Sequence, residues 1–530
     1  MPRNRHGTLS ALLLALLLGC AAAPAGAALA QTLGELDTRN FRTKLAVAGQ
    51  VADSGHPRAS VILSALLEGN LYLTPSGRAV IRSGRNGPVV DALSGEPADA
   101  DGAKKVIINN LMRLQLRAMI ARLDLTHPDT ERRLSAARAL YGELRPDGVD
   151  RIRTLIADEP QARIRDALET AVALAQLRSA DTQARLAAVE RLAGSLEPDV
   201  RNALRRTGGD QSQPPEVRRA AAASLAAIER TVSFYQTLEQ VFFGLSLGSV
   251  LLLAAIGLAI TFGVMGVINM AHGELIMLGA YTTYVVQQLM PNHIGASVVV
   301  AVPAAFLVAG AFGVVIERGV IRFLYGRPLE TLLATFGISL ILQQLVRSVF
   351  SPLNRSVSTP EWMSGSLVIN PVMSFTYNRL TIIVFALLVF AALVVLLRRS
   401  SLGLQVRAVS QNRAMARAVG VRSEWVDAMT FGLGSGVAGV AGVALSQLTN
   451  VGPNLGQSYI IDSFLVVVFG GVGNLLGTLT GAFTLGVANT FLEPVAGAVL
   501  AKILVLVAII LFIQKRPKGL FPQRGRAAEG

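Results

Sequence analysis

Long runs of uncharged residues constrain the fold of this chain more than any other feature. Residues 241–265 and 275–289 contain no Asp, Glu, Lys or Arg, and apolar stretches recur as far as residue 514. A helix that crosses the hydrocarbon core of a bilayer needs about 20 such residues. Hydrophobic residues make up 52% of the chain and charged residues 16%, whereas soluble domains carry about 25% charge. The sequence therefore predicts an all-α integral membrane protein with a polytopic transmembrane helical bundle.

The membrane-embedded domain is expected to cover residues 237–514, with nine spans. These are 241–263, 275–290, 295–316, 331–350, 380–397 and 427–447, two short or broken segments within 461–491, and a last span at 498–513. Basic residues gather in the loops 318–327 and 398–422 and in the tail 515–530, whereas the loop 351–378 holds only Arg355 and Glu361. The excess of Lys and Arg in cytoplasmic loops predicts that this tail is cytoplasmic.

Residues 1–30 have the pattern of a signal peptide. Two arginines precede a short apolar core, and small residues end at Ala30. Cleavage after Ala30 would remove Cys20, the one cysteine of the chain. Alternatively, the segment LLGC ending at Cys20 resembles a lipobox, which would keep this residue as a lipidated N-terminus. Both interpretations predict that the following domain is exported.

Residues 31–232 predict a periplasmic domain of amphipathic helices. Similar helical segments occur at 131–140, 183–192 and 216–225, and another amphipathic helix at 161–177. Asp129 and Asp181 are helix-opening signals before two of them. Such helices bury a face only by stacking on neighbours, as in HEAT-like arrays, and an irregular helical bundle is the alternative. Turn residues favour a hairpin from Leu71 to Ile81.

Polar residues interrupt the apolar runs at Asn269, His272 and Glu274. Ionisable groups at membrane depth cost several kcal/mol unless they face a partner or a water-filled path. The neighbouring Gly266 and Gly273 permit a break in the helix, which would expose backbone groups to a solute. The alternative is a scaffold in which His272 and Glu274 pair to hold two spans together.

Two further segments carry polar or basic residues. The Gly-rich run 469–481 contains Asn474, which offers a donor and an acceptor at depth, although the run would also suit a small-residue helix interface. The loop 402–421 predicts a short helix that ends at Gly420, with Ala408, Met415, Ala418 and Val419 on its apolar face. Such a helix suits a partner's groove, or it lies on anionic membrane lipid.

Enzyme signatures are missing from the sequence. There is no G-x-x-x-x-G-K-[ST] phosphate loop, no H-E-x-x-H, and no clustered His, Asp and Glu at metal-ligand spacing. We expect no catalytic residue, no metal site and no cofactor. The net charge of +14 resides in loops and solvated helix faces, so no nucleic-acid partner is predicted.

As a set, several motifs resemble the permease subunits of branched-chain amino-acid-type ABC transporters. They include INMAHGE at 268–274, LGAY at 278–281, TFGIS at 335–339 with Gln343, the loop 402–421, the Gly-rich segment 469–486 and RPKGLF at 516–521. The resemblance covers residues 237–522. The exported domain of some 200 residues departs from the amino-acid permeases and is similar to the urea-type permease subunit of the same family.

The resemblance implies a bacterial inner-membrane importer. Its partners would be two ATP-binding subunits, a second homologous permease and a periplasmic substrate-binding protein. The loop 402–421 would be the coupling helix that docks on an ATPase, through Gly403, Arg407, Arg413, Met415, Arg417 and Gly420.

Urea is the substrate that the resemblance favours. It is small and neutral, with two NH2 groups and one carbonyl, so Asn269, Glu274, Gln343 and Asn474 could line its path together with His272. Branched-chain amino acids or short amides are the alternative substrates. Two alternative functions belong to other classes of protein: a membrane-anchored sensor and a transporter driven by an ion gradient.

Overall fold

The computed structural model describes residues 23–82, 84 and 87–522. Residues 1–22 of the predicted signal peptide, including Cys20, lie outside the described residues. The chain divides after Arg230 into two compact units. Unit 1 extends to Arg230, and unit 2 begins at Thr231.

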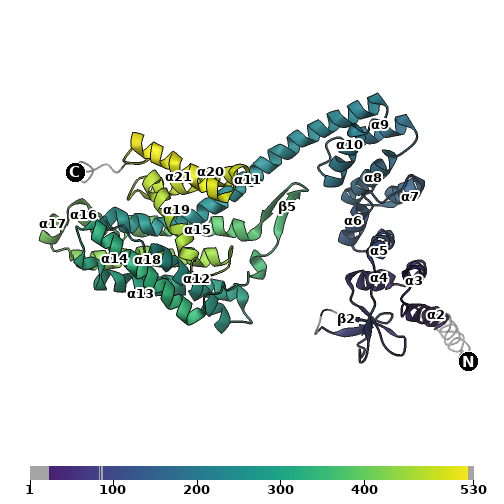
Figure 1. Ribbon diagram of the computed structural model, residues 1–530, viewed down its shortest axis with the longest axis horizontal. Helices are drawn as coiled ribbons and strands as arrows, with labels where there is room; N and C mark the ends of the chain where they lie inside the picture. Colours follow the sequence, from purple (N-terminus) through teal and green to yellow (C-terminus); the bar gives the residue numbers. More distant parts are fainter. Residues whose placement is uncertain (1–22, 83, 85–86, 523–530) are drawn as a thin grey trace, which may run out of the picture. The chain divides into compact units, whose positions relative to one another are not determined.

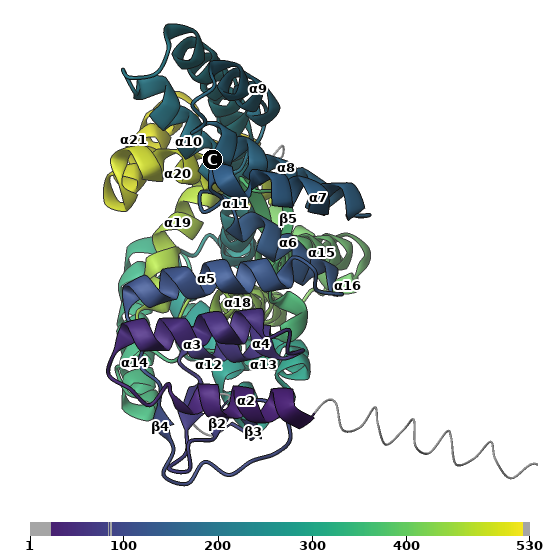
Figure 2. The same cartoon turned by 90° about the vertical axis from the view of Figure 1, so that its right-hand side faces the viewer.

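Unit 1 starts with helices that pack on a small antiparallel sheet (Figure 2). The helices are α2 (Ala23–Gly34), α3 (Phe41–Asp53) and α4 (Ala59–Glu68); the strands are β1 (Leu71–Leu73), β2 (Ala79–Arg82), β3 (Val89–Asp91) and β4 (Lys104–Lys105), in the order β3-β2-β1-β4. Leu71 pairs with Ile81, which confirms the predicted hairpin. Helix α2 continues through the predicted cleavage site after Ala30, and its Leu33 is buried in the core below the sheet.

The sheet makes the all-α expectation wrong for this part of the chain. Strands β3 and β4 were not predicted, because they are short and one of them is fully exposed. Asp91 closes the turn after β3. Its carboxylate accepts hydrogen bonds from the backbone N–H groups of Leu93 and Ser94 and pairs with Arg78 at 2.6 Å. Burial raises the pKa of Asp91, but these three donors outweigh it and hold the pKa below its usual value.

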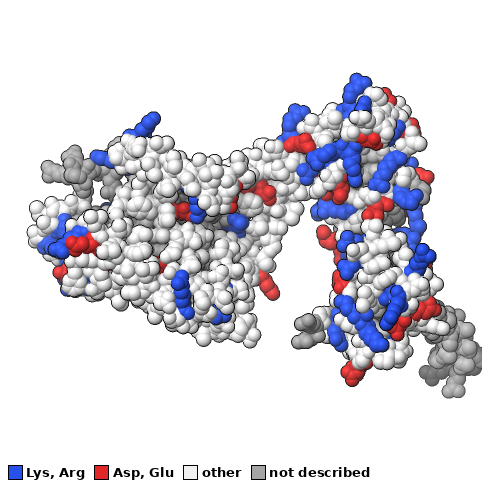
Figure 3. Space-filling view, viewed as in Figure 1, with Lys and Arg blue, Asp and Glu red and all other residues white. Residues whose placement is uncertain are grey.

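The rest of unit 1 is helical. It contains α5 (Asn110–Asp124), α6 (Thr130–Ala139), η1 (Pro146–Gly148), α7 (Val149–Asp158), α8 (Ala162–Gln176), α9 (Thr182–Leu192), α10 (Pro198–Gly209) and the start of α11 (Pro215–Met265). Asp129 caps α6 and Asp181 caps α9 by accepting backbone N–H groups, as predicted. Lys, Arg, Asp and Glu cover this unit densely, whereas the visible face of unit 2 is mostly uncharged (Figure 3). A HEAT-like arrangement stays a prediction.

Unit 2 is a bundle of apolar helices. After α11 it contains α12 (His272–Leu289), α13 (Ile294–Gly319), η2 (Ile321–Phe323), α14 (Pro328–Phe350), η3 (Glu361–Met363), α15 (Tyr377–Arg399), α16 (Ser401–Gln411), α17 (Arg413–Ala418), α18 (Ser423–Ser446), α19 (Leu455–Gly470), α20 (Leu475–Ala496) and α21 (Ala498–Lys515). Within the described residues, seven helices are long and apolar enough to cross a membrane: α11, α13, α14, α15, α18, α20 and α21.

The other two predicted spans are also helices. Helix α12 carries the polar residues of interest, and α19 has 16 residues. The region 461–491 is broken into α19 and α20, as predicted, at Gly471 and Gly473, both of which have positive φ. Each of the nine predicted segments thus coincides with a helix, although the number of crossings stays a prediction.

A second strand pair was not expected. Strands β5 (Ser366–Asn370) and β6 (Met373–Thr376) form an antiparallel hairpin in the loop 351–378. The hairpin packs against α11, where the Phe242 and Phe375 rings lie 4.4 Å apart and Glu239 accepts the backbone N–H of Ser374.

Helix α18 is the centre of unit 2 and packs against α12 and α13 (Figure 1). Of its most apolar 18-residue window, 89% is buried, compared with 17% for α15 and α21. The contacts are backbone to backbone. A Cβ on Gly279 of α12 would overlap the carbonyl oxygen of Gly439, and a Cβ on Gly442 would overlap that of Ile276. Glycine is therefore required at these positions for the helices to approach so closely.

We expect Gly279→Ala to destabilise unit 2 by about 1–3 kcal/mol, the typical cost of overpacking, because the new methyl group meets backbone that cannot yield. Thermal unfolding of the purified full-length chain in detergent measures the effect. Gly337→Ala in α14 is the matched control, because a Cβ there meets nothing within 4 Å. Equal melting temperatures for the two variants would contradict close packing of α12 on α18.

Candidate functional site

Helix α11 breaks at Gly266, whose φ of 65° favours glycine, and the chain becomes helical again at His272. The six residues between α11 and α12 include Asn269, which is 1% exposed. Its side-chain oxygen accepts the N–H of Ala271. The Thr335 hydroxyl of α14 accepts the N–H of Met270, so a neighbouring helix provides a hydrogen-bond partner for the backbone of the broken segment.

The structure separates His272 from Glu274. The Nε2 of His272 donates to the carbonyl oxygen of Ala254 in α11 at 2.8 Å. Glu274 accepts a hydrogen bond from the Ser339 hydroxyl of α14 at 3.1 Å. Residues two apart on a helix face different neighbours, so the hypothesis of a His272–Glu274 pair is wrong. His272 fastens α12 to α11.

Glu274 lies at the middle depth of the bundle. Its partner Ser339 is the central residue of the 23-residue helix α14, about 16 Å from either end at 1.5 Å per residue. Gln343 lies one turn further along the same face of α14 and is 6% exposed. Thr335, Ser339 and Gln343 together form a buried polar stripe opposite the break between α11 and α12.

Several atoms of this stripe and its surroundings keep free hydrogen-bonding capacity. Among the described residues, Oε2 of Glu274, Nε2 of Gln343 and Nδ2 of Asn269 have no hydrogen-bond partner within the protein. One is an acceptor and two are donors. Buried polar groups are normally satisfied, so these atoms are suited to a polar solute. We call Asn269, Glu274, Ser339 and Gln343 the mid-depth cluster.

Asn474 lies elsewhere and has a different role. Its side-chain oxygen accepts the N–H groups of Leu476 and Gly477, which caps α20. Its Nδ2 donates to the carbonyl oxygen of Phe521 at 3.3 Å. The backbone of Leu520 and Phe521 also donates to the end of α19, so the segment RPKGLF closes the break between α19 and α20. Nothing places Asn474 in the mid-depth cluster.

The loop 402–421 forms two helices instead of one, divided at Asn412, which caps α17. Ala408 is half-buried beside Val406 and Val409, and only Met415, Ala418 and Val419 of the expected apolar face are exposed. Gly420 has a φ of 91° and ends this segment, as predicted.

The arginines of this loop are anchored within the chain. Arg413 makes two hydrogen bonds to Asp427 of α18, at 2.8 and 2.9 Å. Arg417 donates to Ser423 at 2.6 Å, and Arg407 donates to the carbonyl oxygen of Leu397. Asp427 is 1% exposed, so α17 is attached to the start of α18 by a bidentate ion pair that is buried on its acidic side.

Sequence reasoning missed Ser339, Thr335 and Asp427 as site or anchoring residues. The four-residue spacing of Thr335, Ser339 and Gln343 in an otherwise apolar span was the available signal. Asp427 gave a similar signal, because it is an acid just inside an apolar run that follows an arginine-rich loop.

A bundle of apolar helices with a broken segment and hydrogen-bonding groups at mid-depth defines a membrane transport protein. A family model described as the branched-chain amino acid transport system permease component matches residues 240–513. The chain belongs to this family. Its relatives are transport permease subunits and not enzymes.

Curated relatives match over nearly their full length. The high-affinity branched-chain amino acid transport system permease protein BraD of Pseudomonas aeruginosa is 32% identical over 297 residues, which are 54% of this chain and 96% of BraD. The high-affinity branched-chain amino acid transport system permease protein LivH of Escherichia coli K12 is 31% identical over 54% of this chain and 96% of LivH. The ribose import permease protein RbsC of E. coli K12 is 28% identical over 54% of this chain and 88% of its own length. No solved structure matches.

We expect Arg413→Gln to destabilise unit 2 by up to about 3 kcal/mol, because it leaves the Asp427 carboxylate buried without its partner. The double variant Arg413→Gln/Asp427→Asn removes both charges and should recover most of that loss. Thermal unfolding of the full-length chain measures both effects. Additive losses in the double variant would contradict a direct pair.

Proposed function

We propose that this chain is the permease subunit of an ATP-driven importer and that its solute passes the mid-depth cluster. The hydrogen bond from Ser339 to Glu274 carries the proposal, because it brings a carboxylate and a polar stripe together at the central depth of α14. A carboxylate at this depth raises the free energy of the fold unless it is fully hydrogen-bonded or lines a path for a polar solute. Glu274 keeps one oxygen free within the described protein.

The chemistry of the cluster suits a solute with N–H donors. The free oxygen of Glu274 accepts from an ammonium or amide group, whereas the side-chain amides of Asn269 and Gln343 donate to a carboxylate or carbonyl oxygen. Amino acids and urea both offer donors and acceptors of this kind. Asn474 makes structural hydrogen bonds, as does the Nε2 of His272, whereas the Nδ1 of His272 has no partner within the described protein.

Branched-chain amino acids are the first candidate substrates, because relatives with that name match the membrane unit over 96% of their length. Urea is the second candidate. It is favoured by the amino-terminal unit, which lies outside the family match to residues 240–513 and sets this chain apart from the amino-acid permeases.

The proposed assembly contains two ATP-binding subunits, a second permease subunit and a periplasmic substrate-binding protein. The proposed topology places unit 1 in the periplasm and the carboxyl terminus in the cytoplasm of a bacterium. The proposed docking surface for an ATP-binding subunit consists of four residues on or beside α16 and α17 that are at least 55% exposed: Leu404, Met415, Val419 and Trp425.

Replacing Glu274 tests the path. In a strain that lacks this chain, Glu274→Gln should lower uptake of the labelled solute at least about tenfold, because it removes a charged hydrogen bond worth about 1.5–3 kcal/mol. Glu330→Gln, an exposed acid on α14, is the matched control. Full uptake by Glu274→Gln at equal membrane abundance would refute the proposed path.

Uptake of both solutes identifies the substrate. Labelled leucine and labelled urea are supplied to the deletion strain with and without the full-length chain. Restored leucine uptake with unchanged urea uptake supports the first candidate, and the reverse supports the second. Restoration of neither solute would reject both.

The docking surface gives a separate expectation. Met415→Asp/Val419→Asp should reduce co-purification of the ATP-binding subunits several-fold, because two exposed apolar contacts on α17 become charged. Leu353→Asp is the control, since Leu353 is 70% exposed but lies in the loop 351–378, on the proposed outer side. Equal losses for both variants would contradict docking at α17.

A further inference from the structure

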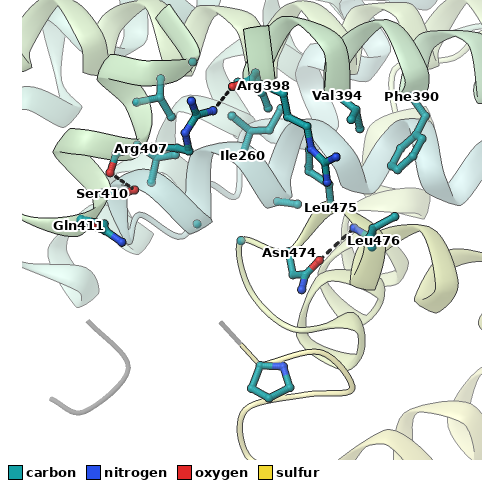
Figure 4. A pocket seen from close by; sticks show the side chains of 18 residues that line it. Ile260, Phe390, Val394, Arg398, Arg407, Ser410, Gln411, Asn474, Leu475 and Leu476 are labelled. Carbon is teal, nitrogen blue, oxygen red and sulfur yellow. Dashed lines mark hydrogen bonds between the residues drawn. The ribbon is translucent and has the colours of Figure 1, made fainter. Parts of the chain in front are cut away.

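A cavity of about 1,020 Å³ lies within unit 2, away from the mid-depth cluster (Figure 4). Its walls come from the end of α11, the second half of α15, α16, the turn 473–476 that starts α20, and Pro522. A Cβ on Gly263 would overlap the backbone of Gly473, so α11 and this turn are in direct contact at one side of the cavity. The cavity is therefore built by five separate segments of the chain.

Part of the cavity wall is basic and polar. The basic and polar residues that line the cavity are Arg398, Arg407, Ser410, Gln411 and Asn474, on both sides of Ile260 (Figure 4), and no Asp or Glu is among the described lining residues. Arg407 is held in place by its hydrogen bond to the carbonyl oxygen of Leu397. Arg398 has no hydrogen bond or ion pair with any described residue and points toward the turn at Leu475 (Figure 4). Two guanidinium groups with no acid beside them form a site for an anion.

The other walls are apolar. Ile260, Phe390, Val394 and Leu476 line the cavity, and Leu476 is 52% exposed. Helix α15 is only 17% buried along its most apolar window, so its outer face is uncovered within the chain. Because α15 is a membrane span, this face gives lipid tails direct access to the cavity wall.

We propose that this cavity binds one anionic phospholipid, with its phosphate on Arg398 and Arg407 and its acyl chains along Phe390, Val394 and the outer face of α15. Charge selects the occupant, since a neutral zwitterionic headgroup would bring a cation toward the two arginines. Basic pockets between spans hold acidic headgroups in this way. The site lies at the end of α15 that the proposed topology places toward the cytoplasm.

The occupant would add to the contact that α15 and α16 already make through Arg407 and the carbonyl oxygen of Leu397. A phosphate between Arg398 and Arg407 would bridge the end of α15 and the middle of α16. Asn474, which also lines the cavity, belongs to the turn before α20 and is hydrogen-bonded to Phe521 of the segment RPKGLF. A bound lipid therefore stabilises the placement of α16, which precedes the proposed docking helix α17.

The full-length chain is purified from nanodiscs of phosphatidylcholine with or without phosphatidylglycerol, and retained lipid is measured by native mass spectrometry. The wild-type chain should retain one phosphatidylglycerol. Arg398→Gln should lower this retention about fivefold, the effect of one interfacial cation worth about 1 kcal/mol. Phe390→Ala should also lower it, and Arg398→Lys should restore it. Arg399→Gln is the matched control, because Arg399 is the neighbouring arginine and does not line the cavity.

Several results would overturn the lipid site. Equal losses for Arg398→Gln and Arg399→Gln would indicate only general attraction to an acidic surface. Equal retention of phosphatidylcholine would refute charge selection. Full displacement by inorganic phosphate, with no effect of Phe390→Ala, would identify a phosphate site instead of a lipid site. Loss of ATP-binding subunits from Arg398→Gln without any change in retained lipid would assign the cavity to that partner.

Discussion

The close approach of α12 and α18 is the constraint on which the rest of the membrane unit depends. Between apolar helices in lipid there is no hydrophobic driving force, so packing contacts and hydrogen bonds must hold them together. Gly279 and Gly439, and likewise Gly442 and the backbone of Ile276, meet without any space for a side chain. Gly439 also faces the backbone of Ala305 in α13. These contacts hold α12 against the central helix α18, and they thereby fix the position of Glu274 in the first turn of α12.

The polar residues of this unit differ in how far their side chains are hydrogen-bonded within the protein. His272, Asn474 and Asp427 each make hydrogen bonds that fasten one segment to another. Glu274 and Gln343 retain free atoms within the described protein. A buried polar group costs less when it is hydrogen-bonded than when it has no partner. The Nδ1 of His272 also has no partner within the described protein, so His272 combines one structural hydrogen bond with one free buried nitrogen.

The sequence predicted the helices well because apolar length is a local property. Each predicted span coincides with a helix, and the hairpin from Leu71 to Ile81 and the caps at Asp129 and Asp181 followed from neighbouring residues. Contacts between distant segments were not accessible in this way. The pairing of Arg413 with Asp427 and the closure of the α19–α20 break by Phe521 depend on the tertiary fold.

The candidate site was predicted only in part, for a related reason. Asn269, Glu274 and Gln343 were identified as rare polar residues in apolar runs, but rarity does not indicate which way a side chain points. The helical spacing of His272 and Glu274 already argued against their pairing. Asn474 stands directly before a helix, which is the position of an N-cap. Local geometry thus distinguishes structural polar residues from candidates for a solute path.

The packing also indicates where this unit can move. Helix α17 is attached to α18 through Arg413 and Asp427, and α18 is locked to α12 and α13 through glycine contacts. These helices therefore move together, because packed backbone does not deform continuously. Helix α14 meets α12 through the hydrogen bond from Ser339 to Glu274, and a Cβ on its Gly337 would meet nothing within 4 Å. If a partner docks at α17 as proposed, we infer that a displacement of α17 is taken up at this boundary, where the mid-depth cluster lies.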